Sequence, residues 1–337
     1  MADHELDVVG IGNAIVDVIA RADDATIAEH GLPKGAMTLI DADQAHDLYN
    51  AMGPAQESSG GSVANTMAGL ASLGGRGAFI GKVRNDQLGG IFRHDLRATG
   101  IAFDSPSAEQ GPPTARCLVF VTPDAQRTMA TFLGISTALA PEDLDTDLIQ
   151  RAKITYLEGY LWDAPPAKEA FVRAAKAAHD AGKRVALSLS DPFCVERHRS
   201  SFRELVEGHV DILFANEHEI TSLYEVDTFD EALQHVRGHC EVAALTRSEK
   251  GSLVLSGDEV HVVDAEPISE LVDTTGAGDM YAAGFLHGFT QGYSLYDCGR
   301  AGAVSAAEVV THVGARPQTP LHKLVAREHE DRHRHHG

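Results

Sequence analysis

The feature that most constrains the fold is a regular alternation of two kinds of segment from about residue 152 onward. Short apolar, β-branched runs are separated by helical stretches such as 165–181, and two Ala-rich helices near 280–290 and 297–311 close the chain. Strands joined through helices run parallel, and a parallel sheet needs helices on both faces. The sequence therefore predicts an α/β fold with a mostly parallel central sheet flanked by helices. The expected strands lie near residues 154–157, 184–188, 211–215, 242–246 and 252–255.

The first 135 residues show shorter elements punctuated by glycine. An apolar run at 6–11 ends at Gly12 and predicts a buried strand before a tight turn. Acidic residues, glycines and a proline break segment 13–41 into short strands and turns rather than long helices. Two β-rich runs at 114–122 and 126–133 predict a hairpin. Two helices are expected here, with Ser62 and Asp86 as their N-caps, and a further strand at 78–83.

Charge and cysteine content exclude several classes of protein. The chain carries 28 Lys and Arg against 49 Asp and Glu, a formal net charge of −21. Such an acidic chain lacks the basic surface of a nucleic-acid-binding protein and would be repelled by an anionic membrane. No apolar run is long enough to span a bilayer, and no secretory pattern opens the chain. The four widely spaced cysteines predict buried free thiols, which favours a reducing cytoplasm.

The stretch 273–279, Asp-Thr-Thr-Gly-Ala-Gly-Asp, concentrates the chemistry of the chain. Two glycines around one small residue let successive N–H groups point the same way, at the positive end of the following helix. Such a turn can bind an oxyanion or a phosphate. An acid in that place, Asp279, would repel the anion, which indicates a general base for a nucleophile that attacks the phosphate. The alternative is a Gly-rich turn in which Asp279 merely starts the helix.

Several motifs in a fixed order give the chain a resemblance to a known family. The motifs are DTTGAGDMYAAGF at 273–285, GGSVAN at 60–65 with Gly74, Gly81 and DQLG at 86–89, NEHE at 216–219, and GIGNAIVD at 10–17. They resemble the signatures of the ribokinase-like (PfkB) carbohydrate and nucleoside kinases, and the opening motif is most similar to the adenosine-kinase-like branch. The resemblance covers nearly the whole chain and implies a ribokinase-like α/β core with a small β-sheet lid.

The resemblance implies ATP as phosphate donor, with Mg²⁺ and, in many relatives, a monovalent cation such as K⁺. Asp279 matches the catalytic base, while Gly276, Ala277 and Gly278 match the anion hole around the transferring phosphate. Read alone, the motif at 216–219 is also a common helix cap. Asn216 and Glu219 match a pair that organises Mg²⁺ through water, and Asp273 matches a ligand of the monovalent cation. Thr246 and Gly251 match a nucleotide-binding turn, in which Ser248 replaces a glycine. Ala306 and Val310 match the helix that borders the adenine pocket. Arg247 or Lys250 could contact phosphate, although charged turn residues are usually only solvated.

On the acceptor side the resemblance implies a site for a hydroxylated ring. Asp17 matches the sugar-binding aspartate, which accepts hydrogen bonds from two adjacent hydroxyls. Segment 126–134 resembles the lid strand, where Arg127 would approach the phosphates on closure. Further expected contacts are Asn13, Gly60, Gly61 and Asn65 for the hydroxyls, Met129, Phe132 and Leu133 for a base, and Tyr160 and Trp162 as aromatic candidates.

These residues favour a kinase for the 5′-hydroxyl of a purine nucleoside, adenosine first, with inosine or guanosine as other acceptors. A ribose or fructose kinase is the alternative, because the apolar lid residues could instead pack the lid against the core. A sensor that binds a nucleoside or sugar without catalysis is the non-enzyme alternative. A Rossmann-type module is disfavoured, since the motif after the first strand lacks its third glycine.

The same reasoning gives an expected domain division. The core would comprise residues 1–12, 42–112 and 136–325, and the lid 13–41 and 113–135. Residues 326–337 would form a flexible charged tail, whose histidines could alternatively bind a metal ion. The expected partners are small molecules only, with no nucleic acid or membrane, and the protein would be a monomer or a homodimer.

Overall fold

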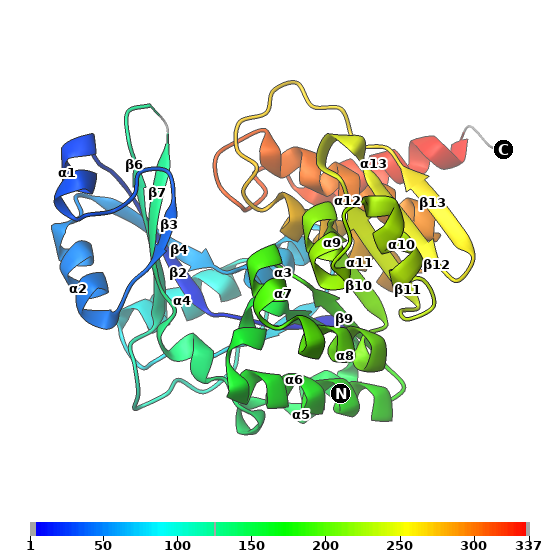
Figure 1. Ribbon diagram of the computed structural model, residues 1–337, viewed down its shortest axis with the longest axis horizontal. Coiled ribbons are helices and arrows are strands. Elements are labelled where there is room, and N and C mark those ends of the chain that lie inside the picture. The colour runs from blue at the N-terminus through cyan, green and yellow to red at the C-terminus, as the bar shows by residue number, and fades with distance from the viewer. Residues whose placement is uncertain (1–4, 125, 335–337) are drawn as a thin grey trace.

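The computed structural model describes residues 5–124 and 126–334 of the chain, which form two β-sheets (Figure 1). The large sheet has eight strands in the order β13-β12-β11-β10-β9-β8-β1-β5. The strands from β11 to β5 run parallel, and β12 and β13 extend the sheet antiparallel. The predicted α/β fold is therefore confirmed. The bounds are β1 Leu6–Ile11, β5 Gly77–Ile80, β8 Ala152–Glu158, β9 Arg184–Ser188, β10 Ile212–Asn216, β11 Val242–Thr246, β12 Ser252–Ser256 and β13 Glu259–Val263.

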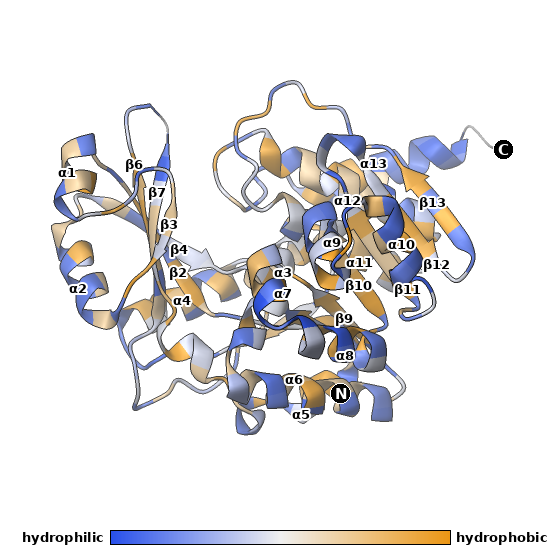
Figure 2. Cartoon of the chain, viewed as in Figure 1, coloured by the Kyte–Doolittle hydropathy of each residue, from blue (hydrophilic) through white to orange (hydrophobic). Residues whose placement is uncertain are grey.

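Apolar side chains on both faces of the large sheet explain why helices cover both faces. Alternate residues of a strand point to opposite faces, so Leu213 packs into one apolar layer and Phe214 into the other. The first layer contains Phe171 of α6, and the second contains Phe285 of α11. Figure 2 shows the central strands as hydrophobic and many outer helix faces as hydrophilic.

The helices are placed close to their expected positions, with one difference in capping. Asp86 caps α4 as predicted, because its side chain accepts a hydrogen bond from the Gly89 N–H. Ser62, in contrast, is the first residue of α3 and makes no cap, since Gly61 is the N-cap residue. The α-helices are α1 Asp24–Glu29, α2 Ala42–Ala51, α3 Ser62–Ser72, α4 Gln87–Ala98, α5 Thr146–Arg151, α6 Pro165–Asp180, α7 Pro192–Arg197, α8 Arg199–His209, α9 Glu217–Tyr224, α10 Phe229–Val236, α11 Ala277–Thr290, α12 Leu295–Val310 and α13 Leu321–Arg334, and the 3₁₀ turns are Gly134–Ala138, Pro141–Asp143, Gly159–Asp163 and Ser248–Lys250.

The small sheet has five strands in the order β3-β7-β6-β2-β4, and the expected hairpin is its β6–β7 pair. Helices α1 and α2 lie on its outer face (Figure 1). The expected division placed residues 42–112 in the core, but β4 pairs antiparallel with β2 throughout its length. Residues of β4 therefore extend the small sheet beyond 13–41 and 113–135. The bounds are β2 Ile15–Arg21, β3 Met37–Leu39, β4 Ala55–Gly60, β6 Ala115–Val121 and β7 Arg127–Phe132.

The C-terminal segment differs from the expected flexible tail. Residues 321–334 form helix α13, and Leu321 and Val325 are buried against the third apolar cluster. Two ion pairs also join the helix to α12: Arg300 to Glu328 and Arg332 to Asp297. The helix is held in place because its few apolar residues pack against this apolar cluster. The sequence did not predict the helix, because most of its residues are charged or histidine. His335 and His336 lie outside the described residues.

The four cysteines are all free, but only Cys194 and Cys298 are buried, whereas Cys117 and Cys240 are half-buried. Among the described residues, no helix combines the length and the apolar character that crossing a lipid bilayer requires.

Candidate active site

The anion-binding turn lies directly before α11, on the large domain. Gly276 adopts a left-handed backbone with φ of +81°, and a Cβ there would come within 2.8 Å of Ala315. Both conditions require glycine at this position. The Ala277 N–H donates to the Thr274 carbonyl at 3.2 Å, so this group is engaged in closing the turn. Gly278 faces open space, which leaves room for an anion at the first turn of α11.

Asp279 is held by side chains from α3, more than 200 residues away in the sequence. The Ser62 hydroxyl donates to Asp279 Oδ1 at 2.6 Å, and Asn65 Nδ2 donates to Oδ2 at 3.3 Å. Thr66 Oγ1 also donates to the Asp279 carbonyl at 2.9 Å, which fixes the backbone. Burial raises the pKa of Asp279 to about 6, although these hydrogen bonds and Arg316 oppose the shift. The carboxylate is oriented and can accept a proton near neutral pH, as a general base must.

Asp17 lies on β2 of the small sheet, next to the two glycines predicted for the acceptor site. A Cβ at Gly60 would come within 2.4 Å of Asp17 Oδ2, and a Cβ at Gly61 within 2.5 Å of the Asn13 carbonyl oxygen. Gly61 also has a φ of +96°, which favours glycine. Burial raises the pKa of Asp17 to about 6, against the opposing charges of Arg316 and Arg127.

Asn13 is held by Glu158, which sequence reasoning missed. Glu158 Oε2 accepts hydrogen bonds from the Asn13 N–H at 3.0 Å and from Asn13 Nδ2 at 2.6 Å. Glu158 Oε1 accepts from the Val63 N–H at 3.0 Å, which ties β8 to the start of α3. The Asn13 Oδ1 atom is buried and has no protein partner among the described residues. A substrate hydroxyl that donates to this oxygen would satisfy it.

Arg316 is a second functional residue that the sequence did not reveal. Its Nε donates to Asn65 Oδ1 at 2.8 Å, and its guanidinium also donates to the Ser59 carbonyl at 2.8 Å. Its charge favours the ionised forms of both Asp17 and Asp279. Arg316 therefore links the acceptor side of the site to the expected base. The residue follows a turn 37 positions after Asp279, where no motif singles it out.

The register of the small sheet decides which lid residues share a face with Asp17. Asp17 pairs with Cys117, which pairs with Thr131, while Met129 pairs with Met37. Paired residues and those two apart along a strand point to the same face, so Met129 lies on the Asp17 face. Two exposed apolar side chains of β3, which the sequence did not predict, share that face: Met37 and Leu39.

Phe132 does not share this face. It is three residues from Met129 along a regularly paired strand, so it points with Thr128 and Ala130 toward the lid helices. The expectation that Phe132 lines a base pocket is therefore wrong by strand alternation. Leu133 lies just past the end of β7 and is not part of the paired face.

Arg127, at the start of β7, spans from the lid to the anion-binding turn. Its guanidinium is 3.1 Å from Asp273 Oδ2, and the strand places it on the same face as Met129. This contact shows that the Asp17 face turns toward the large domain. The oxygens of Asp273 also accept hydrogen bonds from the N–H groups of Thr275 and Gly314, both at 3.0 Å. The positive partner of Asp273 here is thus Arg127, and a role as a K⁺ ligand stays a prediction.

The expected magnesium pair lies at the carboxyl end of β10. Asn216 Oδ1 accepts from the Glu219 N–H at 2.8 Å, and Glu219 Oε1 accepts from the Asn216 N–H at 3.0 Å. The pair thus forms the reciprocal helix cap that was the alternative reading. Burial raises the pKa of Glu219 to about 7, and the nearby carboxylates of Asp191 and Asp279 add to the shift. A divalent cation would relieve this repulsion, so the residues fit Mg²⁺ held through water.

The remaining nucleotide-side residues surround this edge of the sheet. Thr246 pairs with Asn216 across β11 and β10, and Ser248 takes the left-handed backbone, with φ of +53°, that its matching glycine would favour. Arg247 lies 4.4 Å from the centre of the Phe229 ring, so it is engaged away from the turn. Three further residues were expected to bind the nucleotide. Gly251 has a φ of +86°, and the Val310 carbonyl accepts a hydrogen bond from the Asp273 N–H. Ala306 packs at the edge of an apolar cluster. Lys250 ends the 3₁₀ turn and is exposed.

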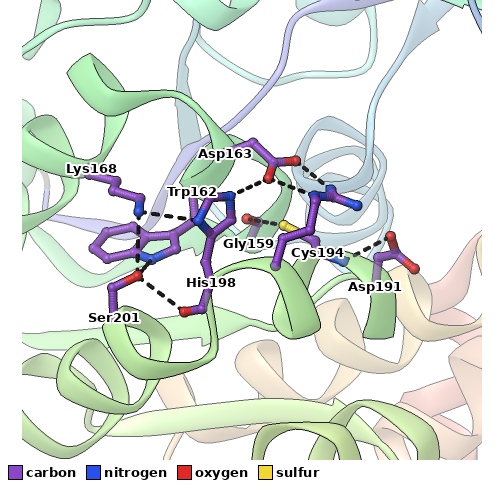
Figure 3. Close-up of polar contacts among 9 residues, drawn as sticks. Gly159, Trp162, Asp163, Lys168, Asp191, Cys194, His198 and Ser201 are labelled. Carbon is purple, nitrogen blue, oxygen red and sulfur yellow. Dashed lines mark hydrogen bonds and ion pairs between the residues drawn. The ribbon is translucent and has the colours of Figure 1, made fainter.

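Of the aromatic candidates, Trp162 belongs to the core rather than to the site. Its ring stacks on Phe171 at 6.0 Å, and its Nε1 donates to the Ser201 hydroxyl at 2.9 Å. Figure 3 shows this contact within a polar network that also includes Lys168 and His198. Tyr160, in contrast, is 44% exposed near the end of β8 and remains a candidate.

Comparisons with known proteins agree with this geometry. Residues 36–322 match the family described as pfkB family carbohydrate kinase. The chain is 52% identical to adenosine kinase from Sinorhizobium meliloti, whose crystal structure superposes with a TM-score of 0.87 over 96% of this chain and 99% of that one. It is 49% identical to a probable sugar kinase protein from Rhizobium etli CFN 42, with a TM-score of 0.88 over 97% of this chain and 99% of that chain.

A relative over nearly the full length is adenosine kinase from Saccharomyces cerevisiae, 24% identical over 94% of this chain and 97% of that protein. Kinases of this family are phosphotransferases that use ATP and act on hydroxyl groups. The family match covers far more than half of the chain. The chain therefore belongs to the pfkB family of carbohydrate kinases.

Proposed function

We propose that this kinase transfers the γ-phosphate of ATP to the 5′-hydroxyl of a purine nucleoside, with adenosine as the preferred acceptor. The observation that carries the proposal is the composition of the lid face around Asp17. A carboxylate that can accept two ribose hydroxyls lies on the same face as Met129, Met37 and Leu39. A purine base presents flat apolar faces that such side chains cover, whereas a bare sugar offers only hydroxyls.

The proposed reaction assigns a separate role to each part of the site. Asp17 and Asn13 hold the ribose hydroxyls, so that the 5′-hydroxyl lies toward Asp279. Asp279 takes the proton of that hydroxyl as its oxygen attacks the γ-phosphorus, and ADP leaves from the opposite side. The N–H groups at the start of α11 and the charge of Arg127 stabilise the phosphoryl oxygens. Bound Mg²⁺ supplies charge neutralisation for the phosphates, near Asn216 and Glu219.

The kinases similar to this chain include both acceptor classes, so the acceptor is the point to test. Adenosine kinase from Sinorhizobium meliloti and the probable sugar kinase of Rhizobium etli are about equally similar to this chain. The shared chemistry of Asp17 and Asp279 serves either acceptor. The apolar residues on the lid face favour the nucleoside.

The test measures ATP consumption with a panel of adenosine, inosine, guanosine, ribose and fructose, together with calorimetric titration of adenosine and ribose. We expect turnover with a purine nucleoside, and adenosine binding at least about tenfold tighter than ribose, which corresponds to roughly 1.4 kcal/mol. Burial of one face of the base against apolar atoms, at about 25 cal/mol per Å², can supply this difference. Equal affinities, or turnover with ribose or fructose alone, would replace the nucleoside by a sugar and leave the assignment of Asp279 intact.

A further inference from the structure

A cluster of metal-ligand side chains joins the last two helices, away from the kinase site. His329 and His333 lie one turn apart on α13, and Asp297 lies in the first turn of α12. Residues four apart on a helix project from the same face, so both imidazoles face the same carboxylate. Asp297 Oδ2 is 3.1 Å from His333 Nε2 and 3.9 Å from His329 Nδ1. One potential ligand atom from each residue lies within 4.8 Å of the others.

These separations are close to those of a metal centre. Zinc binds imidazole nitrogen and carboxylate oxygen at about 2.0–2.2 Å, so ligand atoms at tetrahedral corners are roughly 3.4 Å apart. The separations of 3.1 and 3.9 Å from Asp297 Oδ2 to the two imidazole nitrogens lie on either side of this value. Asp297 has a side chain only 8% exposed, whereas His333 is 60% exposed. The exposed side gives water access to a fourth coordination position.

Among the residues that the structure describes, the ion pairs within the cluster leave one imidazole nitrogen of His329 without a hydrogen-bond partner. Its Nδ1 atom is buried and makes no hydrogen bond within the described part of the chain. A buried nitrogen without a partner is unfavourable, and a metal ion would satisfy it. The ring cannot readily turn away, because it stacks on Tyr293 with 4.1 Å between ring centres and 5° between planes.

Two arginines oppose a cation here: Arg300, which lines the same small cavity but is paired with Glu328, and Arg332. The Nε of Arg332 donates to Asp297 Oδ1 at 3.1 Å, while its guanidinium lies 4.2 Å from the centre of the Tyr296 ring. This contact occupies one carboxylate oxygen and leaves Oδ2 to the two histidines, as single-oxygen coordination requires. The overall charge of −21 favours cation binding at long range.

We propose that Asp297, His329 and His333 bind one divalent transition-metal ion, Zn²⁺ by ligand type, with water as the fourth ligand. Two imidazoles and one carboxylate with an open position are a ligand set that zinc accepts and that Mg²⁺, which prefers oxygen, does not. The ion fastens α13 to the first turn of α12, the helix whose last residue, Val310, accepts a hydrogen bond from the Asp273 N–H.

The test uses the full chain after dialysis against chelator, titrated with Zn²⁺ by calorimetry and with Co²⁺ by visible absorption. We expect one ion per chain, Co²⁺ bands typical of coordination by nitrogen and oxygen, and a melting temperature that rises on adding Zn²⁺. His329→Ala and His333→Ala should each weaken binding by at least tenfold and abolish the Zn²⁺-induced rise. Because the rise is compared within each variant, a variant that is less stable without metal still gives an answer.

Two matched controls separate a built site from a histidine-rich terminus. His322→Ala removes an exposed histidine on the same helix. The double variant His335→Ala/His336→Ala removes the two histidines outside the described residues. Both should bind Zn²⁺ as the unchanged chain does. Absence of binding, retention of binding in His329→Ala, or loss of binding in the 335/336 variant would each overturn the proposal.

Discussion

Two carboxyl groups of the site, Asp17 and Asp279, lie within the electrostatic influence of one half-buried cation, Arg316. Burial raises the pKa of each to about 6, and Arg316 holds both below the value that burial alone would give. The proposed general base, Asp279, must be ionised before it can accept a proton, so we expect its protonation to stop the reaction. We therefore expect these two carboxyl groups and Arg316 to set the acidic limit of the pH range in which the enzyme works.

The replacement Asp279→Asn is expected to lower kcat by about 10²–10⁴-fold with little change in acceptor affinity, because it removes the general base. In the unchanged enzyme, kcat/KM should fall at least about tenfold per pH unit below pH 6, as Asp279 and then also Asp17 become protonated. Steady-state kinetics between pH 5 and 8 check both statements. Near-normal turnover by the Asn variant would remove Asp279 from the proton transfer.

Arg316→Gln is expected to move the acidic limb of the pH profile to higher pH by about 1 unit or more. The lost positive charge no longer favours the ionised forms of Asp17 and Asp279, so their pKa values rise. Arg316→Lys, which keeps a charge, is the control and should shift the limb less. A limb that stays in place in the Gln variant would show that Arg316 acts only through its hydrogen bonds to Asn65 and Ser59.

At the scale of elements, the strand register shows which face of the small sheet each lid residue occupies, which the sequence alone did not show. Met129 and Phe132 are both apolar and lie in one six-residue strand, and composition treats them alike. Only the pairing of β7 with β6 and β3 shows that they occupy opposite faces. Likewise, the polar sequence AQESSG of β4 has no strand character of its own, and its pairing with β2 makes it a strand. The glycine motifs and the α/β alternation, in contrast, can be recognised from neighbouring residues alone, so they were predicted without knowledge of strand pairing.

Met129→Ala should weaken adenosine binding by roughly fivefold, since a truncated side chain covers less of the base, at about 25 cal/mol per Å². Ribose has no base, so its affinity should not change. Phe132→Ala is the matched control on the other face, and it should leave the ratio of the two affinities unaltered. Calorimetric titration of both variants with both ligands gives the ratios. A larger effect of Phe132→Ala on that ratio would place the base elsewhere.

At the scale of the whole molecule, the large negative charge acts against an anionic substrate. The charge of −21 lies mainly beyond the site, while the cations Arg127 and Arg316 lie within it. Added salt shortens the Debye length from about 30 Å at 0.01 M to about 8 Å at 0.15 M and screens the distant charges more than the near ones. The balance of long-range repulsion and local attraction is therefore adjustable by ionic strength.

We expect kcat/KM for MgATP to rise as tetramethylammonium chloride increases from low concentration to 0.15 M, because repulsion between protein and substrate is screened. The same series with KCl is the comparison: an additional rise specific to K⁺ would support the predicted role of Asp273. A decrease with tetramethylammonium chloride would show that the local cations outweigh the overall charge. Stopped-flow measurement of nucleotide binding would separate association from chemistry.

Sequence order along the chain explains why some site residues were found and others were not. The glycine-rich turn and its aspartate form a contiguous signal, so their place could be predicted. Arg316 and Glu158 act through contacts that span 95 to 257 residues, and their surrounding sequence gives no sign of them. Ser62 lies inside the GGSVAN motif, but its contact with Asp279, 217 residues away, could not be predicted from that motif. The folded α13 was hidden for a related reason, since only two of its side chains are buried.

The hydrogen bonds from Ser62 and Asn65 to Asp279 join residues that the ribosome synthesises far apart in time. The acceptor half of the site is translated first, and its partner carboxylate emerges more than 200 residues later. Until residue 316 has also left the exit tunnel, Asp17 lacks one of its two positive neighbours. A growing chain that ends before residue 279 therefore contains all five strands of the small sheet but lacks the carboxylate that Ser62 and Asn65 hold in the folded protein.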